Sequence, residues 1–172
     1  VTLSSGLAAV AVALLAVVRA GDHVLVADSV YGPTRTFCTE TLPQFGVSTT
    51  FFDPLVSSAA LESLMRPNTV AVYLESPGSL TFEVQDVPAI TAWARAHGVV
   101  TFMDNTWATP LYFPAMAHGV DIAILEDGSA KPEEVARALA RCANADLPVA
   151  AITRLAVELA PRRAPVAATE TP

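Results

Sequence analysis

Five short apolar runs, rich in β-branched residues, most constrain the fold of this chain. They are DHVLVAD (22–28), VSTTFFD (47–53), TVAVYLES (69–76), VVTFMD (99–104) and DIAIL (121–125). Most are unbroken rather than alternating with polar residues, as expected for strands buried on both faces of a sheet. Such strands need helices over both faces, so the pattern predicts an α/β fold with a mostly parallel sheet and flanking helices.

Helical patterns lie between these runs, as this fold requires. They cover residues 7–19, 31–44, 59–65 and 86–97. In the last of them Asp86 is a suitable N-cap, Pro88 lies in the first turn and Gly98 follows the end. This alternation predicts βαβ units, and in such sheets ligands bind at the carboxyl ends of the parallel strands.

Composition and charge limit the classes of partner. Hydrophobic residues make up 52% of the 172 residues and charged residues 16%, as in a globular protein. The net charge of −7 gives no reason to expect nucleic acid or an anionic membrane as a partner. The longest apolar run, residues 7–18, is shorter than the about 20 residues that span a bilayer. Cys38 and Cys142 lie far apart, which favours a reducing compartment, and we expect a cytoplasmic protein.

The carboxyl-terminal part of the chain has a different character. The stretch KPEEVARALARC, from Lys131, predicts a helix, and a mixture rich in Ala, Arg and Pro follows it. We therefore divide the chain into an α/β part (1–124), an atypical helical segment (125–160) and a flexible tail (161–172).

Asp104 is the single residue whose position most needs an explanation. It ends the apolar run 99–104, where a carboxylate requires a cationic partner or hydrogen-bond donors. A protonated pyridine nitrogen would be such a partner. A local cap on the turn that follows would also be sufficient. The residue types leave both interpretations open.

Two shorter motifs have a local explanation when each is taken alone. Residues 4–7, Ser-Ser-Gly-Leu, precede the first expected helix, where free N–H groups can bind an anion but a simple cap is more common. Tyr31 follows the first expected strand and can stack on a planar ligand. Gly32 and Pro33 beside it are typical of a turn, and the motif taken alone favours the turn.

Together, the motifs of this chain resemble one enzyme family. In order, they are SSGLAA, VYGPT, LESPGSLTFEVQDVPAI, MDNTWATP and HGVDIAI. The series resembles the Cys/Met-metabolism enzymes that use pyridoxal 5′-phosphate, and it is most similar to their cystathionine β-lyase branch. The most specific stretch is residues 75–88, which begins Glu-Ser-Pro-Gly-Ser. The resemblance covers residues 1 to 124.

The resemblance implies roles for particular residues. Gly6 and Leu7 would offer backbone N–H groups to the phosphate of pyridoxal 5′-phosphate. Tyr31 would stack on the pyridine ring and act in catalysis, and Ser79 would lie near the ring's 3-hydroxyl group. Asp104 would pair with the protonated ring nitrogen, which lets the ring accept electrons from a substrate carbanion.

The resemblance also implies a fold and an activity. The fold would be an incomplete large domain of the aspartate-aminotransferase type, with residues 1–124 as its partial cofactor-binding part. The activity would be carbon–sulfur β-elimination on a small amino-acid substrate, in a homo-oligomer that acts in transsulfuration and methionine biosynthesis. Cystathionine would give homocysteine, pyruvate and ammonia. The alternatives are an inactive remnant of the family and a sibling γ-lyase or γ-synthase.

The motif pattern departs from the family after residue 124. The family would supply its catalytic lysine from a Ser-Ala-Thr-Lys segment soon after DIAI, whereas this chain reads LEDGSAKP over residues 125–132. Lys131, the single lysine of the sequence, lies slightly too far along and is the candidate Schiff-base lysine. A solvated residue at a helix start is the alternative. The arginine that would bind the substrate carboxylate has no match in context, so the resemblance implies a truncated chain.

Overall fold

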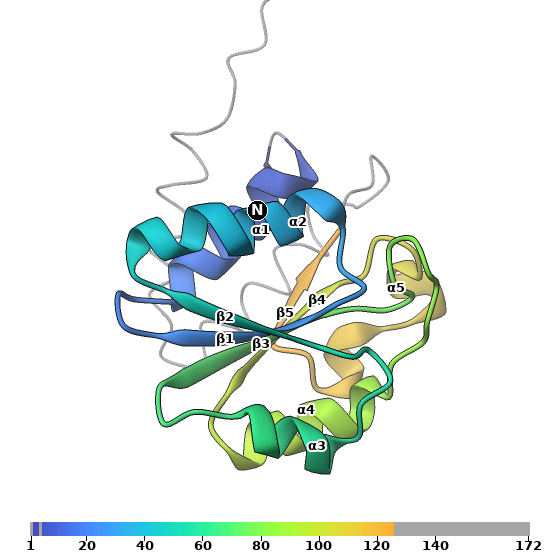
Figure 1. The fold of residues 1–172 in the computed structure, drawn as a ribbon. Helices are drawn as coiled ribbons and strands as arrows, with labels where there is room; N and C mark the ends of the chain where they lie inside the picture. The colour runs from blue at the N-terminus through green and yellow to red at the C-terminus, as the bar shows by residue number, and fades with distance from the viewer. Residues whose placement is uncertain (1, 4, 126–172) are drawn as a thin grey trace, which may run out of the picture.

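A five-stranded sheet forms the centre of the computed structural model, which describes residues 2, 3 and 5–125 (Figure 1). Its strands are β1 (His23–Ala27), β2 (Ser48–Phe52), β3 (Thr69–Glu75), β4 (Val100–Asp104) and β5 (Ile122–Ile124). Their order is β2-β1-β3-β4-β5, and every neighbouring pair is parallel. Each predicted apolar run contains one strand, which confirms the mostly parallel α/β sheet.

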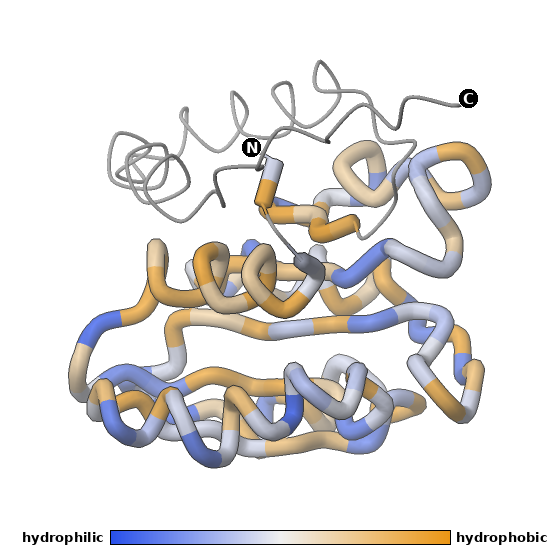
Figure 2. The backbone as a smooth tube through the Cα atoms, turned by 90° about the horizontal axis from the view of Figure 1, so that it is seen from above, coloured by the Kyte–Doolittle hydropathy of each residue, from blue (hydrophilic) through white to orange (hydrophobic). Residues whose placement is uncertain are grey.

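Helices cover both faces of this sheet (Figure 1). On one face α1 (Gly6–Val17) contacts α2 (Gly32–Thr36), and on the other α3 (Ser58–Leu64) contacts α4 (Val87–Ala96). Figure 2 shows the same layers from above, with hydrophobic residues along the central strands. Within the described part of the chain, no helix has the length and apolar character that crossing a membrane requires. The helix expected from Lys131 lies outside the described residues, as does the expected tail.

Local signals explain where α1 begins and where α4 begins and ends. The side chain of Ser5 caps α1 by accepting from the Ala8 N–H at 3.2 Å. Asp86 caps α4 as predicted, since its Oδ1 accepts from the Ala89 N–H at 3.1 Å. Gly98 follows α4 with a φ of 68°, a left-handed conformation that favours glycine.

The helix predicted over residues 31–44 is divided into three segments. After α2 come a π-helical turn, η1 (Phe37–Thr41), and a 3₁₀ turn, η2 (Leu42–Phe45). In the π-helical turn the Leu42 N–H donates to the Phe37 carbonyl, one residue further back than in an α-helix. Pro43 then has no N–H to donate, so a regular α-helix does not continue through it.

Two short helical segments between β4 and β5 were not predicted from the sequence. They are α5 (Thr109–Tyr112) and the 3₁₀ turn η3 (Ala115–His118). Segments of this length carry too few apolar positions to show a helical period.

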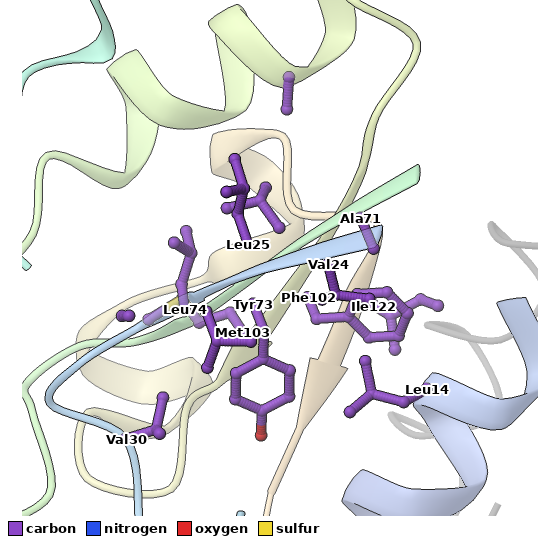
Figure 3. Close-up of a cluster of buried hydrophobic side chains, with 14 of the residues drawn as sticks. Leu14, Val24, Leu25, Val30, Ala71, Tyr73, Leu74, Phe102, Met103 and Ile122 are labelled. Atoms are coloured by element: carbon purple, nitrogen blue, oxygen red, sulfur yellow. The ribbon is translucent and has the colours of Figure 1, made fainter. Parts of the chain in front are cut away.

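The hydrophobic core lies on both sides of the sheet. Figure 3 shows Leu14 of α1 on the same side as Tyr73, while Leu25 extends to the opposite side. All three are fully buried. Tyr73 and Phe102, neighbours in the β3–β4 register, stack with ring centroids 6.2 Å apart. This packing fixes the strands whose carboxyl ends carry the candidate site residues.

His23 connects three strands near the amino-terminal edge of the sheet. Its Nδ1 lies 2.8 Å from Thr69 Oγ1 on β3, and its Nε2 lies 2.9 Å from Thr50 Oγ1 on β2. Because Thr69 Oγ1 already accepts from the Arg66 N–H at 2.8 Å, its own hydroxyl proton is available to Nδ1. Nε2–H then donates to Thr50. A neutral imidazole therefore satisfies every group, and burial together with the charge of Arg66 lowers the pKa of His23 to about 4.

We expect His23 to make the stability of the protein depend on pH. The unfolded chain takes up a proton on this ring below pH 6.5, whereas the folded chain does so only near pH 4. The free energy of unfolding of the wild type, relative to His23→Gln, is therefore constant above pH 6.5 and falls as the pH decreases toward 4. The limiting slope is about 1.4 kcal/mol per pH unit. Urea unfolding of both proteins across this range measures it, and parallel pH profiles would contradict a neutral buried histidine.

Candidate functional site

The residues singled out by the sequence lie at one edge of the sheet. Parallel strands end at the same edge, and Tyr31, Ser79 and Asp104 lie at or just after the ends of β1, β3 and β4. Only a short connection separates the end of α1 from the start of β1, so α1 begins near this carboxyl-terminal edge (Figure 1). Gly6 and Leu7 form that start.

Asp104 ends β4 with only 9% of its surface exposed. Its Oδ1 accepts from the Thr106 N–H at 3.0 Å, which is the local role that the sequence left open. Asn105 shapes the same turn, because its N–H donates to the Ile124 carbonyl at 2.8 Å and its side-chain amide donates to the Phe113 carbonyl at 2.9 Å. The carboxylate of Asp104 is thus held on a braced turn at the end of a buried strand.

Glu75 lies beside Asp104 and was not predicted as a site residue. The two acids are partners in the β3–β4 register, and Glu75 is 3% exposed. Its Oε2 accepts from the Tyr31 backbone N–H at 2.7 Å, and a side-chain hydrogen bond joins it to Ser79. The signal that could have found Glu75 is the one that found Asp104, an acid at the end of an apolar strand.

The two buried carboxyl groups make this edge of the sheet strongly acidic. Burial and the neighbouring charge of Asp104 raise the pKa of Glu75 to about 7, against the opposing hydrogen bonds from Tyr31 and Ser79. Burial and both acids also raise the pKa of Tyr73, two residues earlier on β3. A positively charged group placed here would relieve the repulsion between the acids.

The loop after β3 is docked onto the end of β1. The Ser79 N–H donates to the Ser29 carbonyl at 2.8 Å, and the Gly78 N–H donates to the Glu83 carbonyl at 3.0 Å. A Cβ on Gly78 would lie 2.7 Å from Ser29 Cβ, so this close approach requires glycine. The docking fixes Ser79 next to Glu75 and near Tyr31.

Tyr31 has the turn role that the sequence left open, and its ring remains accessible. It is the N-cap residue of α2 and begins a turn with Gly32 and Pro33. Its side chain is nevertheless 40% exposed, which leaves the ring accessible at the edge of the sheet. The backbone is therefore structural while the ring can contact a ligand.

The start of α1 presents backbone N–H groups at the same edge. The helical hydrogen bonds begin with the Ala9 N–H, which donates to the Ser5 carbonyl at 3.0 Å. The N–H groups of Gly6 and Leu7 come before this ladder. Gly6 is buried and Leu7 is 37% exposed. Lys131, the remaining predicted site residue, lies outside the described residues.

Comparisons with known proteins support the resemblance noted in the sequence. The model of the Cys/Met metabolism PLP-dependent enzymes matches residues 1–127. The cystathionine beta-lyase of Escherichia coli is 46% identical over 121 residues, which cover 69% of this chain and 30% of that protein. An L-alanine/L-glutamate racemase of Wolbachia pipientis is 41% identical over 120 residues, covering 70% of this chain and 29% of the racemase.

A solved structure agrees with the sequence matches. O-acetylhomoserine sulfhydrylase of Wolinella succinogenes is similar with a TM-score of 0.68 and 34% identity, over 72% of this chain and 35% of that chain. The chain spans only 29% to 35% of the length of these three relatives. The predicted family, its fold and its dependence on pyridoxal phosphate are confirmed by these matches. The chain belongs to the family of Cys/Met metabolism PLP-dependent enzymes.

Proposed function

We propose that this chain is the cofactor-binding part of a carbon–sulfur lyase of the cystathionine β-lyase kind. The observation that carries the proposal is the buried pair of acids, Glu75 and Asp104, beside the exposed ring of Tyr31. This set of groups suits pyridoxal phosphate, whose ring nitrogen is a cation when protonated and whose phosphate is an anion.

Asp104 is the group that would accept the ring N–H of the cofactor. Its turn is fixed by the Thr106 N–H and by both hydrogen bonds of Asn105, so the carboxylate needs little reorganisation to bind a cation. Low exposure strengthens the charge interaction, because little water remains to screen it.

The other residues would hold the remaining parts of the cofactor. Tyr31 would stack on the face of the ring, and Ser79 would lie near its 3-hydroxyl group. Gly6 and Leu7 would donate their N–H groups to the phosphate, helped by the positive end of the α1 dipole, about half an elementary charge. Gly6 and Leu7 lie at the start of α1, and Tyr31 lies after the end of β1.

Pyridoxal phosphate, when bound, supplies an electron sink for a carbanion of the substrate. The contribution of Asp104 is to keep a proton on the ring nitrogen, and that of Tyr31 is to hold the ring in one orientation. Lys131 remains the candidate for the lysine that anchors the cofactor and moves the substrate proton. Its alternative role is that of a solvated residue at a helix start.

The substrate class rests on sequence similarity. The match to a cystathionine β-lyase favours cystathionine as substrate and β-elimination as reaction. The matches to a racemase and a sulfhydrylase make both sibling activities part of the test. An inactive remnant that binds the cofactor without turnover is the second candidate, favoured by the unusual position of Lys131. We further propose a cytoplasmic location and a homo-oligomer.

We expect Asp104→Asn to weaken the binding of pyridoxal phosphate about tenfold or more, because a charge-assisted hydrogen bond is lost. Asp53→Asn is the matched control. Asp53 follows β2 and its Oδ1 accepts from the Leu55 N–H at 2.8 Å, a turn of the same kind as that of Asp104. The affinity of the control should equal that of the wild type. Equilibrium dialysis of the three proteins measures this, and equal affinities throughout would contradict the proposed site.

We expect the 172-residue chain to form little or no pyruvate from cystathionine. The reason is that Lys131 lies off the family spacing and that Arg154, Arg162 and Arg163 lie in no matching context for binding the substrate carboxylate. Pyruvate formation, alanine racemisation and sulfhydrylation of O-acetylhomoserine are all measured with saturating pyridoxal phosphate. Steady pyruvate formation that disappears in Asp104→Ala would show that this chain is itself a working lyase.

We expect the chain to self-associate through exposed apolar side chains near the site. Phe82 and Trp107 contact each other with ring centroids 5.1 Å apart, which joins two loops into one apolar surface. The exposed fractions nearby reach 84% at Leu80, in the loop after β3, and 82% at Leu111, in α5. Sedimentation velocity should show association that decreases in the double variant Leu80→Ser/Leu111→Ser. It should not decrease in the control Phe45→Ser, and a compact wild-type monomer would contradict the prediction.

A further inference from the structure

We propose that Glu75 is a positioning residue for the cofactor site. Through its carboxyl group it holds the backbone of Tyr31 and the side chain of Ser79 around the ring that Asp104 binds. The inference rests on the proposed function, since it takes the ring of pyridoxal phosphate as the ligand at this edge.

Glu75 is the point at which three separate segments meet. It belongs to β3, it accepts from the Tyr31 N–H after β1 at 2.7 Å, and it lies directly across from Asp104 on β4. Its hydrogen bond with Ser79 adds the loop that is docked on Ser29. Glu75 therefore contacts or adjoins three of the four segments that the proposed site needs.

The hydrogen bond from the Tyr31 N–H to Glu75 is not easily replaced by a hydrogen bond to another acceptor. The bond is partly buried and Glu75 itself is almost wholly buried, so water would replace the lost carboxyl oxygen poorly. This bond fixes the backbone of Tyr31, the N-cap residue of α2, and so fixes the position from which the Tyr31 side chain extends. Losing the acceptor would leave the Tyr31 ring present but poorly oriented.

A neutral Glu75 can perform this role as well as a charged one. Burial and the charge of Asp104 raise the pKa of Glu75 to about 7, and a protonated carboxyl group keeps a carbonyl oxygen that accepts from the Tyr31 N–H. The role is therefore one of an acceptor in a fixed place rather than of a second negative charge. Glutamine, which has the same shape and the same acceptor, should replace it.

The test compares Glu75→Gln with Glu75→Ala, using Glu40→Gln on the exposed surface as control. Two quantities are measured with pyridoxal phosphate, the dissociation constant and the circular dichroism induced in the cofactor's absorption band. The second reports a fixed ring orientation, which a change in overall stability does not alter. We expect Glu75→Gln to stay within about threefold of the wild type, and Glu75→Ala to bind about tenfold more weakly with a reduced band.

The outcomes separate this inference from the proposed function. The function and the inference are both overturned if the wild type does not bind pyridoxal phosphate. They are also overturned if it binds no more tightly than Asp104→Asn does. Binding that requires Asp104 but is unchanged in Glu75→Ala overturns the inference alone. A loss as large in Glu75→Gln as in Glu75→Ala overturns the acceptor role.

A measurement on the wild type keeps the inference testable if Glu75→Ala does not fold. Pyridoxal phosphate should shift the side-chain carboxyl ¹³C resonances of both Asp104 and Glu75, whereas inorganic phosphate should shift neither. A shifted Asp104 signal beside an unchanged Glu75 signal overturns the positioning role.

Discussion

The parallel pairing of β3 with β4 puts two carboxyl groups, Glu75 and Asp104, side by side at one buried edge, and the local architecture depends on how they are accommodated. Burying two acids together is unfavourable unless donors surround them. The donors come from the loops, since the N–H groups of Tyr31 and Thr106 and the side chain of Ser79 all bind these acids. The loops are therefore ordered by the acids as much as the acids are held by the loops.

The opposite edge of the same sheet also buries an ionisable side chain, but its polar groups are satisfied in a different way. His23 is buried among hydroxyl groups that match both of its ring nitrogens, so its polar network closes on itself and the ring stays neutral. At the carboxyl-terminal edge, by contrast, two acids are buried side by side, and burial together with the charge of Asp104 raises the pKa of Glu75. A closed neutral network has no chemistry to offer a ligand, whereas an acidic edge attracts a cation. The two edges of the sheet therefore differ in the ligands that they can attract, a difference that the strand order alone does not show.

The sequence predicts the sheet and part of the candidate site for separable physical reasons. Unbroken β-branched runs indicate strands buried on both faces, so all five strands were predicted. The prediction of one helix over 31–44 missed its division into three segments, because a π-helical turn has no simple sequence signal. Asp104 was identified because it ends an apolar run. Glu75 was passed over, although it ends one too, because its hydrogen bonds to Tyr31 and Ser79 appear only when three segments meet in space.

In the proposed site, binding of the cofactor and turnover would depend on different parts of this chain. The proposed contacts to the ring and the phosphate come from consecutive segments, in the order start of α1, end of β1, end of β3 and end of β4, so they all lie within the sheet and its first helices. Each contact is fixed by a hydrogen bond or a close approach within that unit. A lysine that attacks the cofactor has to reach this edge from beyond β5. A chain that keeps the sheet is thus expected to keep affinity for pyridoxal phosphate even where the placement of Lys131 prevents catalysis, because holding the ring and reacting with it are tasks of different residues.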